Sequence, residues 1–104
     1  MDILLILKAL SDENRLKIVQ LLSQKKYCVR ALSRQLGISE PAVSQHIRVL
    51  KQAGILQAGD KKGYNLHYAV NKDTLLLLSA QIATLAQDIV QDRECGGHCR
   101  EEKK

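Results

Sequence analysis

Apolar residues recur every three or four positions in five separate segments of the chain, and this spacing predicts five helices. In the fourth segment, Val43, Ile47 and Leu50 fall on one side of a helical wheel and polar residues fall on the other. Gly37 and Gly54 follow the third and fourth segments and are typical helix stop signals. The predicted helices span residues 3–10, 12–22, 29–35, 39–52 and 72–91.

Between the fourth and fifth helices the apolar period shortens toward two, which is typical of strands. Ile55–Asp60 and Asn65–Val70 are the strand candidates, and the basic turn Lys61-Lys62-Gly63-Tyr64 joins them into a hairpin. The predicted fold class is mainly α with a small β-hairpin, a winged helix-turn-helix with a two-stranded wing. We expect one DNA-binding and dimerisation domain over residues 1–91 and a flexible, Cys-containing tail over residues 92–104.

The segment 39–52 has the features of a helix that reads DNA. A tight turn around Gly37 joins it to the preceding helix, and Ser39 is an N-cap candidate. Such a helix enters the major groove, where Glu, Gln and Arg side chains hydrogen-bond base edges and Ala contacts a thymine methyl. Lysines at its end and in the hairpin are expected to hold phosphates. The predicted DNA-binding residues are Ser39, Glu40, Ala42, Ser44, Gln45, Arg48, Lys51, Lys61, Lys62 and Tyr64.

Basic residues are concentrated in the middle of the chain. The whole chain of 104 residues carries a net charge of +5, whereas residues 24–62 carry eight basic and two acidic side chains. A localised positive surplus is typical of a surface that faces phosphates, so double-stranded operator DNA is the predicted partner. Ordinary solvated helices also carry Lys and Arg, and the charge therefore supports the motif without replacing it.

The sequence lacks targeting and catalytic motifs. No apolar run approaches the ~20 residues that span a bilayer, and the N-terminus has neither a basic region nor a small-residue cleavage site. We therefore expect a cytoplasmic protein with no membrane partner. No nucleophile elbow, phosphate-binding loop or acid pair is present, so an enzyme is not expected. No protein partner other than a second copy is evident.

Three separate stretches agree in order and spacing with one known family. They read LKALSDENRLKIVQLL, ALSRQLGISEPAVSQHIRVLKQAGIL and KKGYNLHYAV, and the pattern of the closing helix agrees as well. Over about residues 4–70 the chain thus resembles the arsenic-repressor type (ArsR/SmtB) family of winged-helix transcriptional regulators. The resemblance implies a homodimer built from the first and last helices, a palindromic operator, and a repressor that releases DNA when an inducer binds.

The last predicted helix carries an apolar seam that fits such a dimer. Its apolar residues are spaced alternately by three and four positions, as in a coiled coil. On a monomer this seam would be a large exposed apolar patch. The predicted interface residues are Ile3, Leu7, Leu75, Leu78, Ile82, Leu85 and Ile89.

The chain departs from the metal sites that the family resemblance would imply. The family's arsenic-site pattern, Cys-Val-Cys at the start of the third helix, here reads Cys28-Val29-Arg30, so its second thiolate is missing. The family's zinc-type site on the last helix uses Asp and His, and residues 72–91 contain no His. We interpret His46 and His67 as structural or close to DNA rather than as ligands.

The remaining candidate ligands lie in the tail. Cys95 and Cys99 flank Gly-Gly-His98, and thiolates are the ligands that soft ions prefer. With Cys28 they would supply three sulfurs for As(III), Sb(III) or another thiophilic ion, with His98 as an optional fourth ligand. The ion would act as the inducer. No obligatory cofactor is expected. Two alternatives stay open. Cys95 and Cys99 can instead form a reversible disulfide or polysulfide bridge, or the repressor has no cysteine-based sensing and Cys28 is a small buried hydrophobe.

Overall fold

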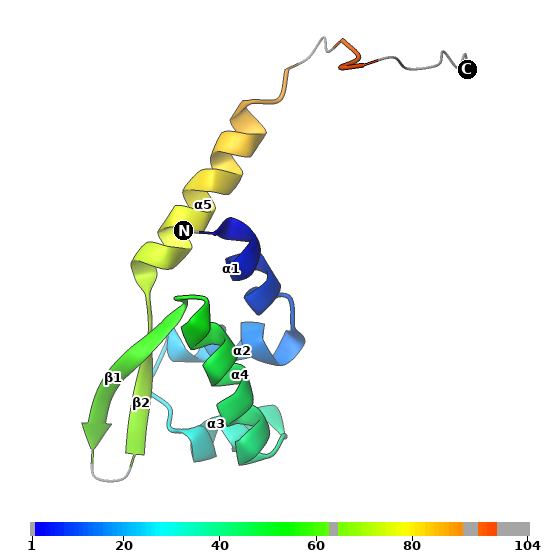
Figure 1. The fold of residues 1–104 in the computed structure, drawn as a ribbon. Coiled ribbons are helices and arrows are strands. Elements are labelled where there is room, and N and C mark those ends of the chain that lie inside the picture. Colours follow the sequence, from blue (N-terminus) through cyan, green and yellow to red (C-terminus); the bar gives the residue numbers. More distant parts are fainter. Residues whose placement is uncertain (1, 63–64, 91–93, 98–104) are drawn as a thin grey trace.

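The computed structural model describes residues 2–62, 65–90 and 94–97, without the side chains of residues 60–65. Its helices form a cluster beside a two-stranded hairpin, and the last helix extends away from that cluster (Figure 1). The predicted count of five helices and two strands is confirmed for this part of the chain. The elements are α1 (Ile3–Leu10), α2 (Glu13–Leu22), α3 (Val29–Leu36), α4 (Glu40–Gln52), β1 (Leu56–Lys62), β2 (Asn65–Val70) and α5 (Lys72–Gln87).

Short polar side chains fix where the helices begin. The Asp12 carboxylate accepts hydrogen bonds from the backbone N–H groups of Asn14 and Arg15, at 2.9 and 3.1 Å, and so caps α2. The Ser39 hydroxyl accepts from the Ala42 N–H at 3.2 Å, which starts α4 at the predicted position. Each bond satisfies a backbone donor that has no partner within the helix.

The turn between α3 and α4 depends on one glycine. Gly37 follows α3 with φ of 69°, a left-handed conformation that glycine adopts without steric cost. The Ser33 hydroxyl donates to the Ile38 carbonyl at 2.5 Å and closes the same turn. The two helices therefore leave the turn in a fixed orientation, as a helix-turn-helix requires.

The hairpin departs from its predicted boundaries. Ile55 lies outside β1 because its N–H donates to the Leu50 carbonyl at 2.9 Å, which completes the end of α4. The strand then runs on to Lys62, two residues into the predicted turn. Pairing with β2 is antiparallel, with Leu56 opposite Val70, and an irregularity between Ala58 and Lys61 shifts the register.

One apolar core joins these elements. It is built from aliphatic residues, and Leu75 and Leu78 of α5 pack against its edge. The three residues predicted to face inward from α4 are fully or almost fully buried, which confirms that prediction. The buried core residues are Ile6, Ala9, Ile18, Val19, Leu22, Leu32, Val43, Ile47, Leu50, Ala53, Ile55 and Leu56.

The fifth helix ends at Gln87, four residues earlier than predicted. Its last turn contains no basic residue, and Asp88 follows at the negative end of the helix dipole. The residues of its outer half are exposed, and none of them is among those that form the core or pack against it. The division of the chain near residue 91 stays a prediction, because residues 91–93 lie outside the described part of the chain.

Candidate nucleic-acid interface

The outward face of α4 carries most of the residues predicted to contact DNA. Ser39 and five of the predicted contact residues on the helix are exposed, and Ala42 is half-buried. The opposite face of the helix is held in the core, so the polar face is presented as a rigid unit. The predicted contact residues that are exposed on the helix are Glu40, Ser44, Gln45, Arg48 and Lys51.

Two contacts orient side chains on this face. Arg48 Nη1 donates to Gln45 Oε1 at 3.0 Å, one helical turn apart. Arg30 Nε, from α3, lies 3.7 Å from Glu40 Oε2 and forms an ion pair at the start of α4. Both pairs are exposed, so each contributes little to stability and can exchange its partner for a base or phosphate.

The wing and α4 meet at one cation–aromatic contact. Lys51 Nζ lies 5.5 Å from the centroid of the Tyr68 ring of β2. This contact holds the basic end of α4 beside the hairpin. Lys61 and Lys62 belong to β1, but their side chains and all of Tyr64 lie outside the described residues. Their predicted contacts with phosphates therefore stay predictions.

Behind α4 lies a polar cluster that sequence reasoning missed. Arg15 Nη1 lies 3.4 Å from His46 Nδ1, and His46 Nδ1 lies 3.9 Å from an oxygen of Asp12. The Arg15 backbone N–H donates to the Asp12 carboxylate and holds its pKa below the ordinary value of 3.8. The charges of His46 and Arg15 add to this effect, whereas partial desolvation opposes it. Asp12 stands at the predicted start of the second helix, but nothing in the sequence indicates its contact with α4.

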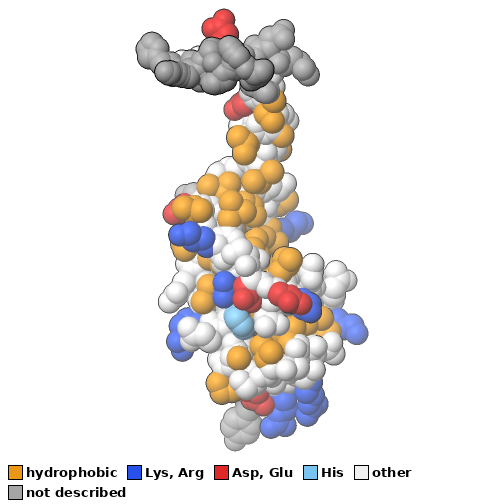
Figure 2. Space-filling view, turned by 90° about the vertical axis from the view of Figure 1, so that its right-hand side faces the viewer, with side chains coloured by type: hydrophobic (Ala, Val, Ile, Leu, Met, Phe, Trp, Pro, Cys, Tyr) orange, Lys and Arg blue, Asp and Glu red, His pale blue; other side chains and the backbone are white. Residues whose placement is uncertain are grey.

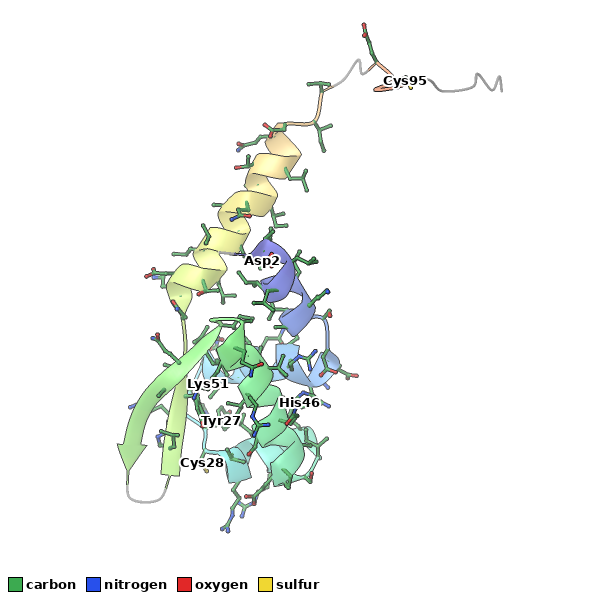
Figure 3. The ribbon with its side chains drawn as sticks, in the orientation of Figure 1. Asp2, Tyr27, Cys28, His46, Lys51 and Cys95 are labelled. Atoms are coloured by element: carbon green, nitrogen blue, oxygen red, sulfur yellow. The ribbon has the colours of Figure 1, made fainter. Side chains whose placement is uncertain are left out.

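Two of the predicted metal ligands, Cys28 and Cys95, are not brought together in this protomer. Cys28 is a half-buried free thiol at the start of α3, and Cys95 is exposed beyond α5 and disulfide-bonded. The two residues lie at opposite ends of the molecule (Figure 3). Cys99 and His98 fall outside the described residues. Within the described ranges, no three His, Cys, Asp or Glu side chains converge as a metal site would require.

The residues predicted to form a dimer divide into two groups. Leu75 and Leu78 are half-buried against the core of their own chain, and Ile3 is half-buried as well. The others are exposed, as are Leu4 and Leu76, which the predicted seam did not include. Figure 2 shows apolar side chains gathered along the upper part of one face of the molecule. Exposed members of the predicted set are Leu7 at 40%, Ile82 at 45%, Leu85 at 67% and Ile89 at 65%.

Comparison with known proteins decides the family. Residues 12–58, which include the whole helix-turn-helix, match the model described as "Bacterial regulatory protein, arsR family". The arsenical resistance operon repressor of Escherichia coli strain K12 is 35% identical over 97 residues, covering 92% of this chain and 73% of its own. The chain belongs to the ArsR family. The Staphylococcus aureus arsenical resistance operon repressor is 33% identical, covering 90% of this chain and 92% of its own.

A solved structure agrees with the fold of this ArsR-family chain. The homodimeric winged helix-turn-helix DNA-binding domain of Mb0332 from Mycobacterium bovis superposes with a TM-score of 0.63 at 23% identity. The match covers 88% of this chain and 84% of the other. The predicted winged helix-turn-helix is therefore confirmed.

Family membership also settles the general class of function. The protein is a DNA-binding transcriptional regulator rather than an enzyme, as the sequence predicted. None of the helices in the described part of the chain combines the length and the apolar character that crossing a bilayer requires.

Proposed function

We propose that this ArsR-family chain is a homodimeric repressor that reads a palindromic operator with α4 and releases it when a thiophilic ion binds. The observation that carries the DNA-binding part is the exposed polar face of α4, backed by a buried apolar face. Gln45 and Arg48 are one turn apart on that face and are already hydrogen-bonded to each other. In the groove, Gln45 is suited to adenine and Arg48 to guanine or a phosphate.

Operator binding tests these roles with two variants. Gln45→Ala should weaken binding to the preferred operator by about 1–3 kcal/mol and leave binding to random DNA almost unchanged. Lys51→Ala should weaken both alike and reduce the dependence of affinity on salt, because a phosphate contact carries no sequence information. If the two variants behave identically on operator and random DNA, α4 does not have the proposed role.

The homodimer is supported by the exposed apolar residues of α1 and α5. Leu4, Leu7, Ile82, Leu85 and Ile89 are 40–67% exposed in the single chain. Burying these side chains against a second copy removes them from water, and large exposed apolar surfaces usually mark interfaces. The structurally similar M. bovis domain is itself described as homodimeric.

The inducer is proposed from the chemistry of the tail. Cys95 and Cys99 are separated by three residues, two of them glycine, and this spacing suits chelation of a soft ion such as arsenite or antimonite. Two relatives named as arsenical resistance operon repressors support this ion class. Because Cys28 is distant from Cys95 in one protomer, its participation requires the partner's tail or a rearranged tail.

Redox sensing is the second candidate, and one observation favours it. Cys95 is disulfide-bonded while Cys28 is a free thiol. A tail disulfide that forms under oxidising conditions would change the conformation of the tail, and this change would need no metal ion.

One set of measurements separates the two candidates. Operator release is followed under reducing conditions with arsenite, zinc, cadmium or copper, in wild type and in Cys28→Ser, Cys95→Ser and Cys99→Ser. Release by arsenite that disappears in Cys95→Ser and Cys99→Ser supports the ion. Release by oxidant alone, reversed by a reductant, supports the disulfide. An unchanged response of both tail variants to every inducer shows that the tail is not the sensor.

A further inference from the structure

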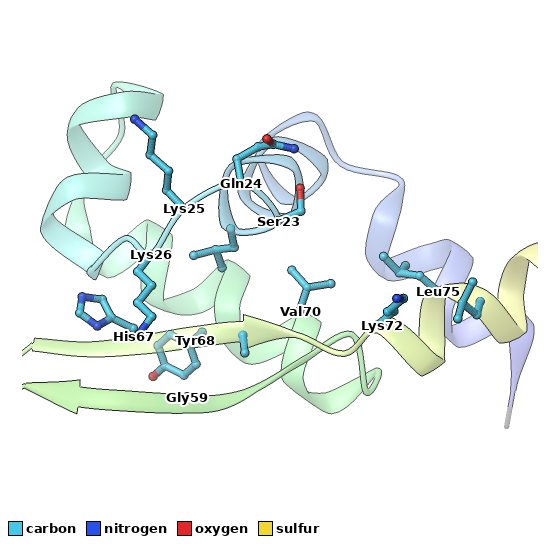
Figure 4. A pocket seen from close by; sticks show the side chains of 13 residues that line it. Ser23, Gln24, Lys25, Lys26, Gly59, His67, Tyr68, Val70, Lys72 and Leu75 are labelled. Carbon is cyan, nitrogen blue, oxygen red and sulfur yellow. The ribbon is translucent and has the colours of Figure 1, made fainter.

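One cavity has a lining that contains neither a cysteine nor a residue of α4. It has a volume of about 670 Å³, within the range of small-molecule sites in proteins. Figure 4 shows it between the α2–α3 loop and β2, with the start of α5 at one end. Three parts of the winged helix-turn-helix therefore share its walls: the loop that leads into α3, the wing and the start of α5.

The lining of this cavity combines an apolar floor with positive charge. Leu22, Val70 and Leu75 supply aliphatic surface, and Lys26 and Lys72 supply positive charge, whereas the side chain of Lys25 points away from β2 (Figure 4). Among the described residues that line it, none is acidic. An apolar surface with a rim of one charge sign complements a molecule that has an apolar body and an anionic group.

A buried polar atom in the same wall also lacks a partner. His67 lines the cavity, and its Nδ1 atom is buried without a hydrogen bond in the described part of the chain. Buried polar atoms are nearly always hydrogen-bonded, and an exception often marks a place where a ligand or water completes the bond. An imidazole nitrogen can donate to the oxygen of a carboxylate, sulfonate or phosphate.

The cavity is connected to α4 through Tyr68. This side chain lines the cavity, and its ring lies 5.5 Å from Lys51 Nζ. A ligand that displaces the ring would displace Lys51 as well. Binding at this cavity thus has a direct structural route to a residue that is proposed to hold an operator phosphate.

We propose that this cavity binds a small amphipathic anion, with its apolar body against Leu22, Val70 and Leu75 and its charge near Lys72 and His67. Occupancy lowers operator affinity through Tyr68 and Lys51. The effect on operator affinity rests on the proposed function of α4, whereas binding of the anion does not. The site differs from the thiol sensor in position and in ligand chemistry.

Two fluorescent probes of matched shape test the binding. The anion is 1-anilinonaphthalene-8-sulfonate, and N-phenyl-1-naphthylamine is the same aromatic body without the sulfonate. Lys72→Glu should weaken binding of the anion about tenfold and leave binding of the neutral probe unchanged. The variant should fold normally, because an acidic residue in the first turn of α5 is favourable. Lys17→Glu, on the exposed surface of α2, changes the net charge equally and should affect neither probe.

Location and coupling are measured separately. Amide NMR shifts caused by the anion should cluster at Val70, Lys72 and Leu76. His67→Leu should weaken binding of the anionic probe and leave binding of the neutral probe unchanged. The proposed site is overturned if the shifts are confined to the apolar residues of α1 and outer α5. It is also overturned if wild type and Lys72→Glu bind the anion with equal affinity. Saturating anion should lower operator affinity at least about fivefold in wild type. Probe binding without any such change overturns the coupling but not the site.

The thiol proposal is tested independently of this one. In the double variant Cys95→Ser/Cys99→Ser, the anion should still bind and still lower operator affinity. Loss of both effects in this variant contradicts the cavity and assigns the probe to the tail. Loss of the arsenite response alone leaves the cavity proposal standing.

Discussion

Nη1 of Arg15 lies 3.4 Å from Nδ1 of His46, and this contact joins α2 to the middle of α4. The same guanidinium reaches the end of α1, where Arg15 Nε donates to the Ala9 carbonyl at 2.6 Å. One charged side chain therefore holds three helices together. Because α1 contributes to the proposed dimer and α4 to the proposed DNA contact, Arg15 links the two surfaces mechanically.

Replacing Arg15 should destabilise the fold more than replacing a neighbouring surface cation. Arg15→Ala removes hydrogen bonds from a charged group and leaves the Ala9 carbonyl at the end of α1 without its donor, so we expect a loss of about 1.5–3 kcal/mol. Arg15→Lys keeps the charge but not the fork of donors and should recover only part of this loss. Urea unfolding measures both. Lys17→Ala, which breaks an exposed pair with Glu13, should cost less than about 1 kcal/mol.

Stability should fall in acid partly because of Asp12. Its pKa in the folded protein is below the ordinary value of 3.8, chiefly because the Arg15 N–H donates to the carboxylate. A depressed pKa contributes stability above the ordinary value, and this contribution disappears as the pH falls through the lower, folded-state pKa. Unfolding free energies should therefore drop as the pH falls below about 5 and on through the folded-state pKa. Asp12→Asn keeps a cap acceptor but does not titrate, so its curve should be flatter. Parallel curves would contradict this assignment.

The joint between α4 and α5 depends on a buried hydroxyl. Thr74 is 1% exposed, and its Oγ1 donates to the Gly54 carbonyl at 2.7 Å. Thr74→Val keeps the shape but leaves that carbonyl without its donor, and should cost about 1–3 kcal/mol. Thr74→Ser should retain most of the stability because the hydroxyl remains. Thr84→Val is the matched control, since Thr84 is exposed, and should change stability by less than about 0.5 kcal/mol. Equal melting curves for Thr74→Val and Thr84→Val would contradict the role of Thr74.

Helices and their inward faces were readable from the sequence because they depend on local signals. The cap at Ser39, the glycine at 37 and the spacing of Val43, Ile47 and Leu50 all act within one or two turns. These features place α4 and its polar face correctly. The list of candidate DNA contacts followed from that face, and those candidates whose side chains the structure describes are exposed or half-buried.

Features that depend on distant contacts were not readable. The bond between Arg15 and His46 spans 31 positions, and nothing in either segment indicates it. Ile55 was predicted to be the first residue of a strand, but its N–H donates to the Leu50 carbonyl at the end of α4. Likewise, the apolar spacing on α5 predicted that Leu75 and Ile82 both lie in the dimer interface. Of the two, Leu75 packs on the core of its own chain.

The dimer prediction uses this difference between the two halves of α5. Ile82 is 45% exposed and is not among the core residues of its own chain, so a change there should alter association without unfolding the monomer. Ile82→Glu places a charge in the proposed apolar interface, and an unpaired buried charge is strongly unfavourable. We expect monomers in sedimentation experiments at concentrations where wild type is dimeric. Operator affinity should fall as well, because one protomer reaches only one half-site.

Thr84→Glu is the matched control for this variant. Thr84 is exposed on the same helix, ~160° around the axis from Ile82, so the added charge should face solvent. This variant should sediment as a dimer and bind the operator like wild type. Dissociation of both variants would indicate that charge anywhere on α5 disrupts the helix. A tight dimer in Ile82→Glu would exclude the apolar seam as the interface, since no dimer built on Ile82 accommodates two buried carboxylates at neutral pH.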